Sequence, residues 1–272
     1  MSLGPFDLTG GPFLTLYGVL LVATIVAGFI IPRWLRPEGR TARVTDSDQL
    51  AFLAGGAMRF ADTVVARLLA SRALGLAGGK NFYSMDRNAG RTAAERSVLT
   101  LPAPIGWPAI ASALKSYAEP VESRLVADGL VMDRGLTWQM RFWQTLPYLL
   151  LLIFGAIKWE IGTLRDRPVG YLTALLVVTA LFAIIRLAAV DRRTRGGLEA
   201  LTQARARSER LRRAPTANET DLAVALFGTA VLVGSGWSEF HQMRTTSSGD
   251  SGSSGGDGGS GCGGGGCGGC GG

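Results

Sequence analysis

The sequence predicts a mainly α membrane protein with three transmembrane helices, a small α+β soluble domain of winged-helix-like layout, and a disordered Gly/Cys tail. Three observations predict this class. The 272 residues are 47% hydrophobic, and their mean hydropathy is +0.23. The apolar residues are concentrated in a few runs of about the length that a helix needs to cross a bilayer. Residues 247–272 hold only Gly, Ser, Asp and Cys, which cannot bury a core.

The first predicted transmembrane helix covers residues 13–31. This run contains no charged residue, and about 19 helical residues cross the ~30 Å of bilayer hydrocarbon. A cleaved signal peptide is the alternative, but residues 1–12 contain no Lys or Arg and include Asp7. Four arginines follow the run: Arg33, Arg36, Arg40 and Arg43. By the positive-inside rule they place the N-terminus outside and the following residues in the cytoplasm.

Residues 146–162 and 170–190 are predicted to be the second and third transmembrane helices. The loop between them is short, so the two helices should form an antiparallel hairpin. Lys158 and Glu160 lie near the outer end of the second helix, where long side chains can reach the interface. Trp159 beside them is typical of an aromatic belt.

A basic cytoplasmic segment follows at residues 191–213. Its eight arginines and three acidic residues leave a net charge of +5, which agrees with the orientation derived from the first helix. We therefore expect a multi-pass protein of the inner (plasma) membrane whose partners are the lipid bilayer and anionic lipid headgroups. Nucleic acid is not favoured as a partner of this segment, because few aromatic residues lie between its arginines.

Residues 44–140 are predicted to form the soluble domain, a candidate for binding a protein partner. Thr45 and Asp48 have the spacing of a capping box that opens a helix over 47–54, and Gly55-Gly56 breaks the pattern. A second helix over 57–71, a glycine turn at 74–76 and a strand over 81–85 follow.

The layout then partly repeats. Three helices are predicted, over 92–99, 107–117 and 120–127, with Pro120 at the first position of the last; a strand over 130–133 follows. In each unit a helix leads into Gly-Leu and an extended piece, as in winged-helix modules. A second hypothesis is therefore a membrane-tethered DNA-binding regulator that uses helix 57–71. That helix carries Arg59, Arg67 and Arg72, but Asp62 among them would repel phosphate.

Residues 216–238 are predicted to form an apolar helix, opened by a second capping box at Thr216 and Glu219. The stretch 222–238 lacks charged side chains before Glu239, and its roughly 17 residues are at the lower limit for a span. We favour a helix that packs on the protein or lies in the interface, with a fourth span as the alternative.

The histidine and the cysteines all lie after residue 240: His241, Cys262, Cys267 and Cys270. Imidazole or thiolate catalysis and His-rich metal sites are therefore excluded from the preceding residues. The spacing C-x4-C-x2-C makes the three cysteines candidate metal ligands for a soft ion such as Zn²⁺ or Cu⁺; an inert flexible tail is the alternative. No catalytic or cofactor-binding residue is predicted, although an enzyme that uses carboxylate or Lys chemistry remains a third hypothesis.

Three stretches resemble a family of uncharacterised bacterial membrane proteins: residues 50–56, residues 224–228 and the cysteine run 262–270. Members of this family have one N-terminal span, a soluble domain, a pair of spans and often a low-complexity Gly/Cys-rich terminus. The resemblance implies this architecture, carries no functional residue over, and favours treating 222–234 as part of it. We therefore expect a non-enzymatic interaction or scaffold protein with a flexible thiol or metal-binding tail.

Overall fold

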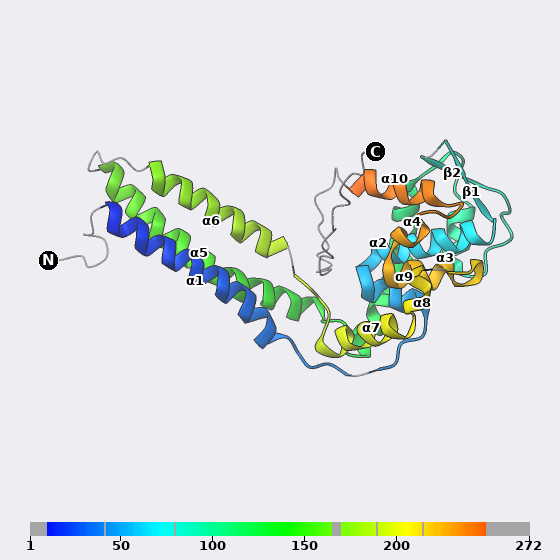
Figure 1. Ribbon diagram of the computed structural model, residues 1–272, viewed down its shortest axis with the longest axis horizontal. Helices are drawn as coiled ribbons and strands as arrows, with labels where there is room; N and C mark the ends of the chain where they lie inside the picture. The colour runs from blue at the N-terminus through cyan, green and yellow to red at the C-terminus, as the bar shows by residue number, and fades with distance from the viewer. Residues whose placement is uncertain are drawn as a thin grey trace, which may run out of the picture.

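The computed structural model describes residues 10–40, 42–78, 80–164, 170–188, 190–213 and 215–248 (Figure 1). The structure is mainly helical, with 74% helix and a small sheet. Three long helices form a bundle: α1 (Gly10–Leu35), α5 (Arg134–Leu164) and α6 (Gly170–Ala188). The other elements form a domain at the end of the bundle where α1 ends and α5 begins.

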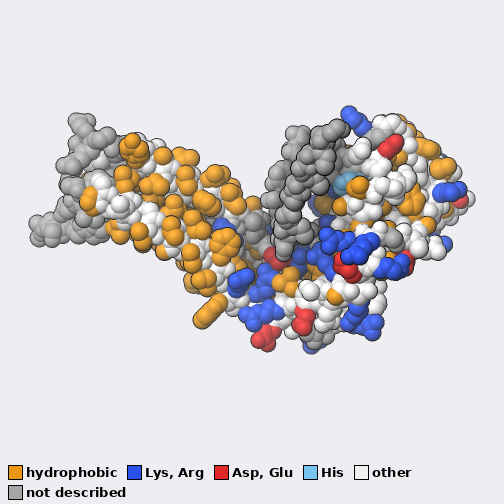
Figure 2. Space-filling view, viewed as in Figure 1, with side chains coloured by type: hydrophobic (Ala, Val, Ile, Leu, Met, Phe, Trp, Pro, Cys, Tyr) orange, Lys and Arg blue, Asp and Glu red, His pale blue; other side chains and the backbone are white. Residues whose placement is uncertain are grey.

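All three bundle helices are long and apolar enough to cross a membrane. Hydrophobic side chains cover the outside of the bundle (Figure 2), including those of Val19, Val22, Leu150, Ile153, Val177 and Ile184. A smaller core of Phe13, Tyr17, Leu21, Leu151 and Leu172 holds the helices together. The predicted segments 13–31 and 146–162 lie inside α1 and α5, but α5 begins at Arg134 and is therefore longer than the predicted span.

Helix α2 (Ser47–Ala70) is the centre of the domain, and it is kinked where the glycine pair was predicted to break it. Gly56 has φ +67° and ψ −157°, a conformation that only glycine adopts readily. The predicted N-cap is wrong by one residue. Asp46, and not Thr45, caps the helix, because its carboxylate directly precedes the first turn and accepts from the Asp48 N–H at 3.2 Å.

A three-stranded antiparallel sheet follows, formed by β1 (Leu74–Ala77), β2 (Asn81–Ser84) and β3 (Ile105–Gly106) in that order. Leu76 pairs with Phe82, which is fully buried. The glycine turn predicted at 74–76 is therefore wrong: these residues are a strand whose leucines pack inward, and the turn includes Gly78, which has φ +60°.

Helices α3 (Ala93–Leu99) and α4 (Trp107–Ala127) pack on α2. Thr92 and Glu95 form a capping box at the start of α3. The two helices predicted over 107–127 are one continuous helix. Pro120 does not end it, because the proline lies on the exposed face while Leu114, Ala118 and Leu125 continue the buried face past it. The strand predicted over 130–133 is only a single bridge between Val131 and Arg193.

The second half of the domain comes from the chain that follows the bundle. It contains α7 (Arg195–Arg207), α8 (Glu209–Arg213), α9 (Thr220–Phe227), α10 (Ser238–Ser248) and the short 3₁₀ turns η2 (Ala217–Glu219) and η3 (Thr229–Leu232). Leu201, Val224, Leu232 and Phe240 share one core with residues of α2, α3 and α4. The predicted boundary 44–140 is therefore wrong, because the core needs both segments and residues 134–140 belong to α5.

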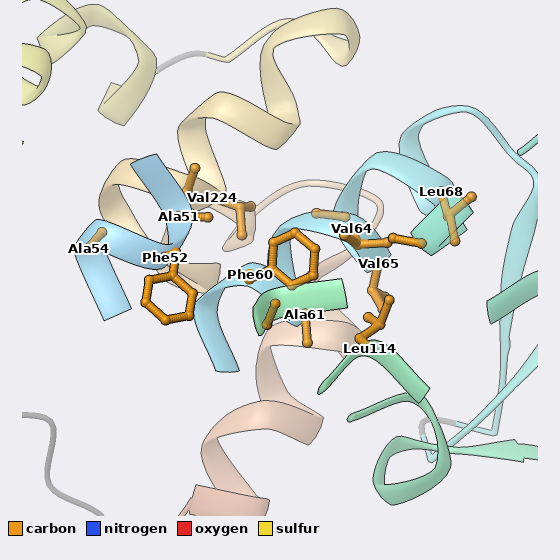
Figure 3. Close-up of a cluster of buried hydrophobic side chains, with 14 of the residues drawn as sticks. Ala51, Phe52, Ala54, Phe60, Ala61, Val64, Val65, Leu68, Leu114 and Val224 are labelled. Carbon is orange, nitrogen blue, oxygen red and sulfur yellow. The ribbon is translucent and has the colours of Figure 1, made fainter. Parts of the chain in front are cut away.

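Residues 216–238 do not form one helix. Gly228 and Gly234 adopt φ values of +86° and +82°, and they divide the stretch into α9, η3 and a turn. The eight residues of α9 extend only about 12 Å, too short to cross hydrocarbon. Ala223, Val224, Ala225 and Leu226 are fully buried, and Val224 lies in the cluster that contains Ala51 and Phe60 of α2 (Figure 3). The fourth-span alternative is therefore wrong for α9.

We predict that Gly56→Ala lowers the free energy of unfolding by roughly 1–3 kcal/mol, because an L side chain is strained at positive φ with ψ near 180°. A Cβ at residue 56 meets no neighbouring atom within 4 Å, so the effect reports backbone strain alone. The measurement is thermal unfolding of the full chain in detergent. Gly236→Ala is the control, because that position is equally open and lacks a positive φ. Equal midpoints for the two variants would contradict the assigned kink.

Candidate functional site

The predicted metal ligands Cys262, Cys267 and Cys270 lie outside the described residues, so the metal site stays a prediction. His241 of α10 is described, and its Nδ1 lies 3.0 Å from the Thr229 hydroxyl oxygen of η3. Within the described ranges no group of three or more His, Cys, Asp or Glu side chains could hold a metal ion.

Basic side chains gather where the bundle meets the domain (Figure 2). We call this set the boundary collar, and it consists of Arg33, Arg36, Arg141, Arg186, Arg192, Arg193 and Arg195. Arg36 Nη2 lies 3.2 Å from Asp191 Oδ2, and Arg195 Nη2 donates to the Arg33 carbonyl at 3.1 Å. These bonds join the end of α1 to the chain that follows α6. The collar therefore holds these two segments together where the bundle meets the domain.

The backbones at this junction are also paired. The Arg195 N–H donates to the Pro37 carbonyl at 3.0 Å, and the Gly196 N–H donates to the Glu38 carbonyl at 2.7 Å. A Cβ on Gly196 would lie 2.3 Å from the Arg40 carbonyl oxygen, so only glycine permits this approach. Two of the connections between the bundle and the domain, the one after α1 and the one after α6, therefore lie against each other.

Exposed tryptophans surround the collar. Trp34, Trp138 and Trp143 are 86%, 68% and 47% exposed, and all three lie at the domain end of the bundle. Trp159, near the other end of α5, donates from Nε1 to the Thr173 hydroxyl oxygen at 3.0 Å. Trp138 and Trp159 are separated by roughly 32 Å of helix, close to the ~30 Å thickness of bilayer hydrocarbon. Aromatic side chains at this spacing are typical of the two interfacial belts of a membrane protein.

Inside the domain, Arg67 of α2 joins three carboxylates. Its guanidinium nitrogens lie 2.5 Å from Asp48, 3.1 Å from Glu95 and 3.2 Å from Asp221, and Nη2 also donates to the Ser47 hydroxyl at 2.9 Å. Burial would lower the pKa of Arg67, but the three carboxylates outweigh it and raise the pKa above its ordinary value. We call these residues the Arg67 clamp; it ties the start of α2, α3 and α9 to the last turn of α2.

The carboxylates of the clamp bear on the hypothesis of an enzyme. An enzyme that uses carboxylate chemistry needs clustered carboxylates that face a pocket, and three carboxylates do cluster here. However, each one faces the same guanidinium, and Glu95 in addition accepts from the Arg91 N–H at 2.7 Å and the Thr92 N–H at 3.2 Å. Side chains whose oxygens are occupied in this way hold structure and are poorly placed to take protons from a substrate.

A second buried ion pair fastens α10. Arg244 Nε lies 2.6 Å from Asp62 Oδ1, and the Arg244 guanidinium carbon lies 4.0 Å from the centre of the Trp107 ring. Burial raises the pKa of Asp62, and the charge of Arg244 opposes that rise. Helices α2, α4 and α10 therefore meet at one charged contact in an apolar surrounding.

These contacts count against the hypothesis that residues 57–71 read DNA. Arg59 donates to the Val224 carbonyl at 3.3 Å and Arg67 forms the clamp. Asp62, which was expected to repel phosphate, is the buried partner of Arg244. Most of this stretch of α2 is covered by other helices, so it cannot enter a major groove.

Comparison of the whole chain with protein-family models, curated proteins and solved structures found no match. The resemblance to the bacterial membrane-protein family therefore stays a prediction.

Sequence reasoning missed the clamp and the Asp62–Arg244 pair, but it contained one signal for them. Asp62 and Arg67 occur within an apolar helical stretch of otherwise buried residues. Because a buried charge is costly without a partner, two such residues indicate partners elsewhere in the chain. The sequence does not say which residues those are.

We predict that Arg67→Met lowers the free energy of unfolding by about 3–5 kcal/mol near neutral pH, because three carboxylates then face one another without a cation. In the folded protein burial raises the pKa of Asp48 and the charge of Arg67 opposes that rise, so removing Arg67 raises this folded-state pKa further above the unfolded value of about 4. A raised folded pKa gives stability that is present at low pH and lost as the pH rises. The difference between wild type and variant should therefore grow between about pH 4 and pH 7.

The measurement is the unfolding midpoint of the full chain as a function of pH. Arg124→Met is the matched control, because Arg124 is an exposed arginine on α4 with no ion pair among the described side chains. A pH-independent difference, or an equal effect of both variants, would show that the clamp does not carry the predicted electrostatic stability.

Proposed function

We propose that the protein is a membrane-anchored, non-enzymatic interaction or scaffold protein of the inner membrane. Helices α1, α5 and α6 form the anchor, the domain lies on the cytoplasmic side, and the Gly/Cys tail leaves the domain on that same side. One observation carries this proposal: a single hydrophobic core is built from chain on both sides of the α5–α6 pair.

The shared core constrains the topology. Leu114 precedes α5 and Val224 follows α6, yet both belong to that core. Two segments in contact must lie on one side of a membrane, so α5 and α6 have to cross it as a pair that returns the chain. The basic residues after α1 and after α6 then favour the cytoplasm for the domain.

The boundary collar supports a domain held close to the lipid surface. Its arginines and the exposed tryptophans near them lie at one end of the apolar bundle, which in a bilayer is where headgroups meet hydrocarbon. An anionic leaflet attracts each such cation by about 1 kcal/mol at low ionic strength. The domain is therefore presented at the membrane, with its remaining surface open to a protein partner.

The start of the tail is fixed by α10. Phe240 is fully buried, its ring centre lies 5.9 Å from that of Trp107, and Arg244 pairs with Asp62. Ser248 at the end of α10 therefore belongs to the domain. No apolar run separates it from Cys262, so the cysteines should share the domain's side, where reduced thiols can bind a soft metal ion.

We predict that the tail cysteines react with a membrane-impermeant maleimide only after cells are permeabilised. In a background without the three cysteines, Ser123→Cys on the exposed surface of α4 marks the domain side, and Ser2→Cys marks the N-terminus. Ser123→Cys should behave like the tail, and Ser2→Cys should react in intact cells. Opposite reactivity of Ser123→Cys and the tail would overturn the shared-core topology.

We predict that the full chain binds about one Zn²⁺ or Cu⁺ ion through the tail, because three thiolates form a suitable set of soft ligands. The measurement is metal stoichiometry of the reduced protein after dialysis. The triple variant Cys262→Ser, Cys267→Ser and Cys270→Ser should lose this metal while keeping its unfolding midpoint. Equal metal content in both proteins would favour the alternative, a tail that serves only as a flexible extension.

A further inference from the structure

A polar cluster lies inside the bundle at its domain end, apart from the ion pairs of the domain. Gln144 of α5 is 2% exposed, and its Nε2 donates to the Arg186 carbonyl of α6 at 2.8 Å. That carbonyl is in the last turn of α6, where the helix itself supplies no donor. Arg141 precedes Gln144 by three residues and therefore lies on the same face of α5.

Helix α1 completes the cluster with a glycine and an aromatic ring. The Arg186 guanidinium carbon lies 4.2 Å from the centre of the Phe29 ring. A Cβ at Gly28 would lie 2.8 Å from the Tyr148 hydroxyl oxygen and 3.3 Å from Arg186 Nε. Glycine at residue 28 therefore lets a hydroxyl and a guanidinium from two other helices reach the backbone of α1.

The two cations of this cluster lack the partners that other arginines have. Arg141 Nε and Arg186 Nη2 are both buried, and neither has a hydrogen-bond partner. Arg36, Arg192 and Arg193 each lie within ion-pair distance of a carboxylate. Within the part of the chain that the structure describes, no carboxylate forms such a pair with Arg141 or Arg186.

We propose that this cluster, the Arg141/Arg186 site, binds the phosphodiester headgroup of one anionic phospholipid between α1, α5 and α6. The inference rests on the proposed function, because it requires that these helices span the membrane. Unpaired guanidinium groups at the edge of hydrocarbon are costly, and phosphate oxygens accept from two N–H groups of arginine at once. Basic pockets between helices on the cytoplasmic side take such headgroups.

The surroundings favour a lipid over a free anion. Phe142 and Trp143, which follow Arg141 directly, are 55% and 47% exposed on the outside of the bundle. An acyl chain attached to the bound phosphate can lie along these rings and along the apolar face of α5. The bound headgroup is shielded on the protein side, whereas the other arginines of the collar attract a diffuse layer of lipid that salt readily disperses.

The test is native mass spectrometry of the full chain, purified in mild detergent and stripped of lipid. The protein is incubated with phosphatidylglycerol or with phosphatidylcholine of the same acyl chains. We expect one phosphatidylglycerol per chain. It should be retained at about 0.5 M salt, a concentration that screens surface attraction, and phosphatidylcholine should not be retained in the same way. Arg141→Gln and Arg186→Gln should each weaken retention by about tenfold or more.

Arg33→Gln is the matched control, because it removes one collar charge from an exposed side chain and should leave retention unchanged. Arg186→Lys keeps the positive charge but cannot donate two parallel hydrogen bonds to one phosphate. Its retention of phosphatidylglycerol should therefore be intermediate. If Arg186→Gln does not elute as a folded protein, Arg141→Gln and Arg186→Lys carry the comparison.

Three outcomes would overturn the site: equal retention of the two lipids, an equal loss in Arg33→Gln, or displacement of phosphatidylglycerol by millimolar inorganic phosphate. The last would show that the pair binds phosphate without regard to lipid. Extraction of membranes with alkaline carbonate tests the membrane anchor separately. If the chain resists extraction but shows no lipid preference, the proposed function stands and only the lipid site is rejected.

Discussion

The packing of α9 on α2 is the interaction on which the rest of the domain depends. The kinked helix α2 is covered on most of its surface, and α9 contributes four fully buried residues to that cover. The same contact places Asp221 against Arg67 and the Val224 carbonyl against Arg59. The burial of apolar side chains and the pairing of buried charges therefore occur at the same contact. Both need the chain before α5 and the chain after α6 together.

The kink in α2 links this core to the end of the apolar bundle. The helix breaks at Gly55 and Gly56, directly after the Ala54 carbonyl. Arg193 of the boundary collar donates to that carbonyl and also pairs with Asp191, which in turn pairs with Arg36 at the end of α1. A chain of polar contacts thus runs from the centre of the domain to the anchor.

The features that depend on local sequence could be predicted, and those that depend on distant contacts could not. Uncharged runs located the three apolar helices, the glycine pair located the kink, and the helix predicted over 92–99 corresponds to α3. The interpretation of Pro120 as a helix start was wrong, because the buried face of α4 outweighs the loss of one hydrogen bond. A strand at 74–76 was taken for a turn, because Gly75 is a turn residue by local preference alone.

The candidate sites were harder to predict from the sequence. Charge counting identified the basic segment, but it could not show which arginines are paired. Arg36 and Arg192 have carboxylate partners far away in the sequence, Asp191 and Glu122, whereas Arg186 has none among the described residues. The partners of Asp62 and Arg67 lie as far as 182 residues away, a separation over which periodicity carries no information. The tail cysteines remain a prediction from spacing alone.

The discontinuous core has a consequence for the order of events during synthesis. Val131 and Val224 belong to the same core, and at about 5–20 residues per second the ribosome needs roughly 5–20 s to make the chain between them. For that interval α2 is without α9, and its apolar face is open to chaperones. If α5 and α6 span a membrane as proposed, their hairpin has to insert within the same interval. If only one of the two helices inserts, α9 emerges on the wrong side and the domain stays open. On the proposed topology, closure of the domain therefore requires insertion of both helices, and a chain that fails to insert keeps the apolar face of α2 exposed.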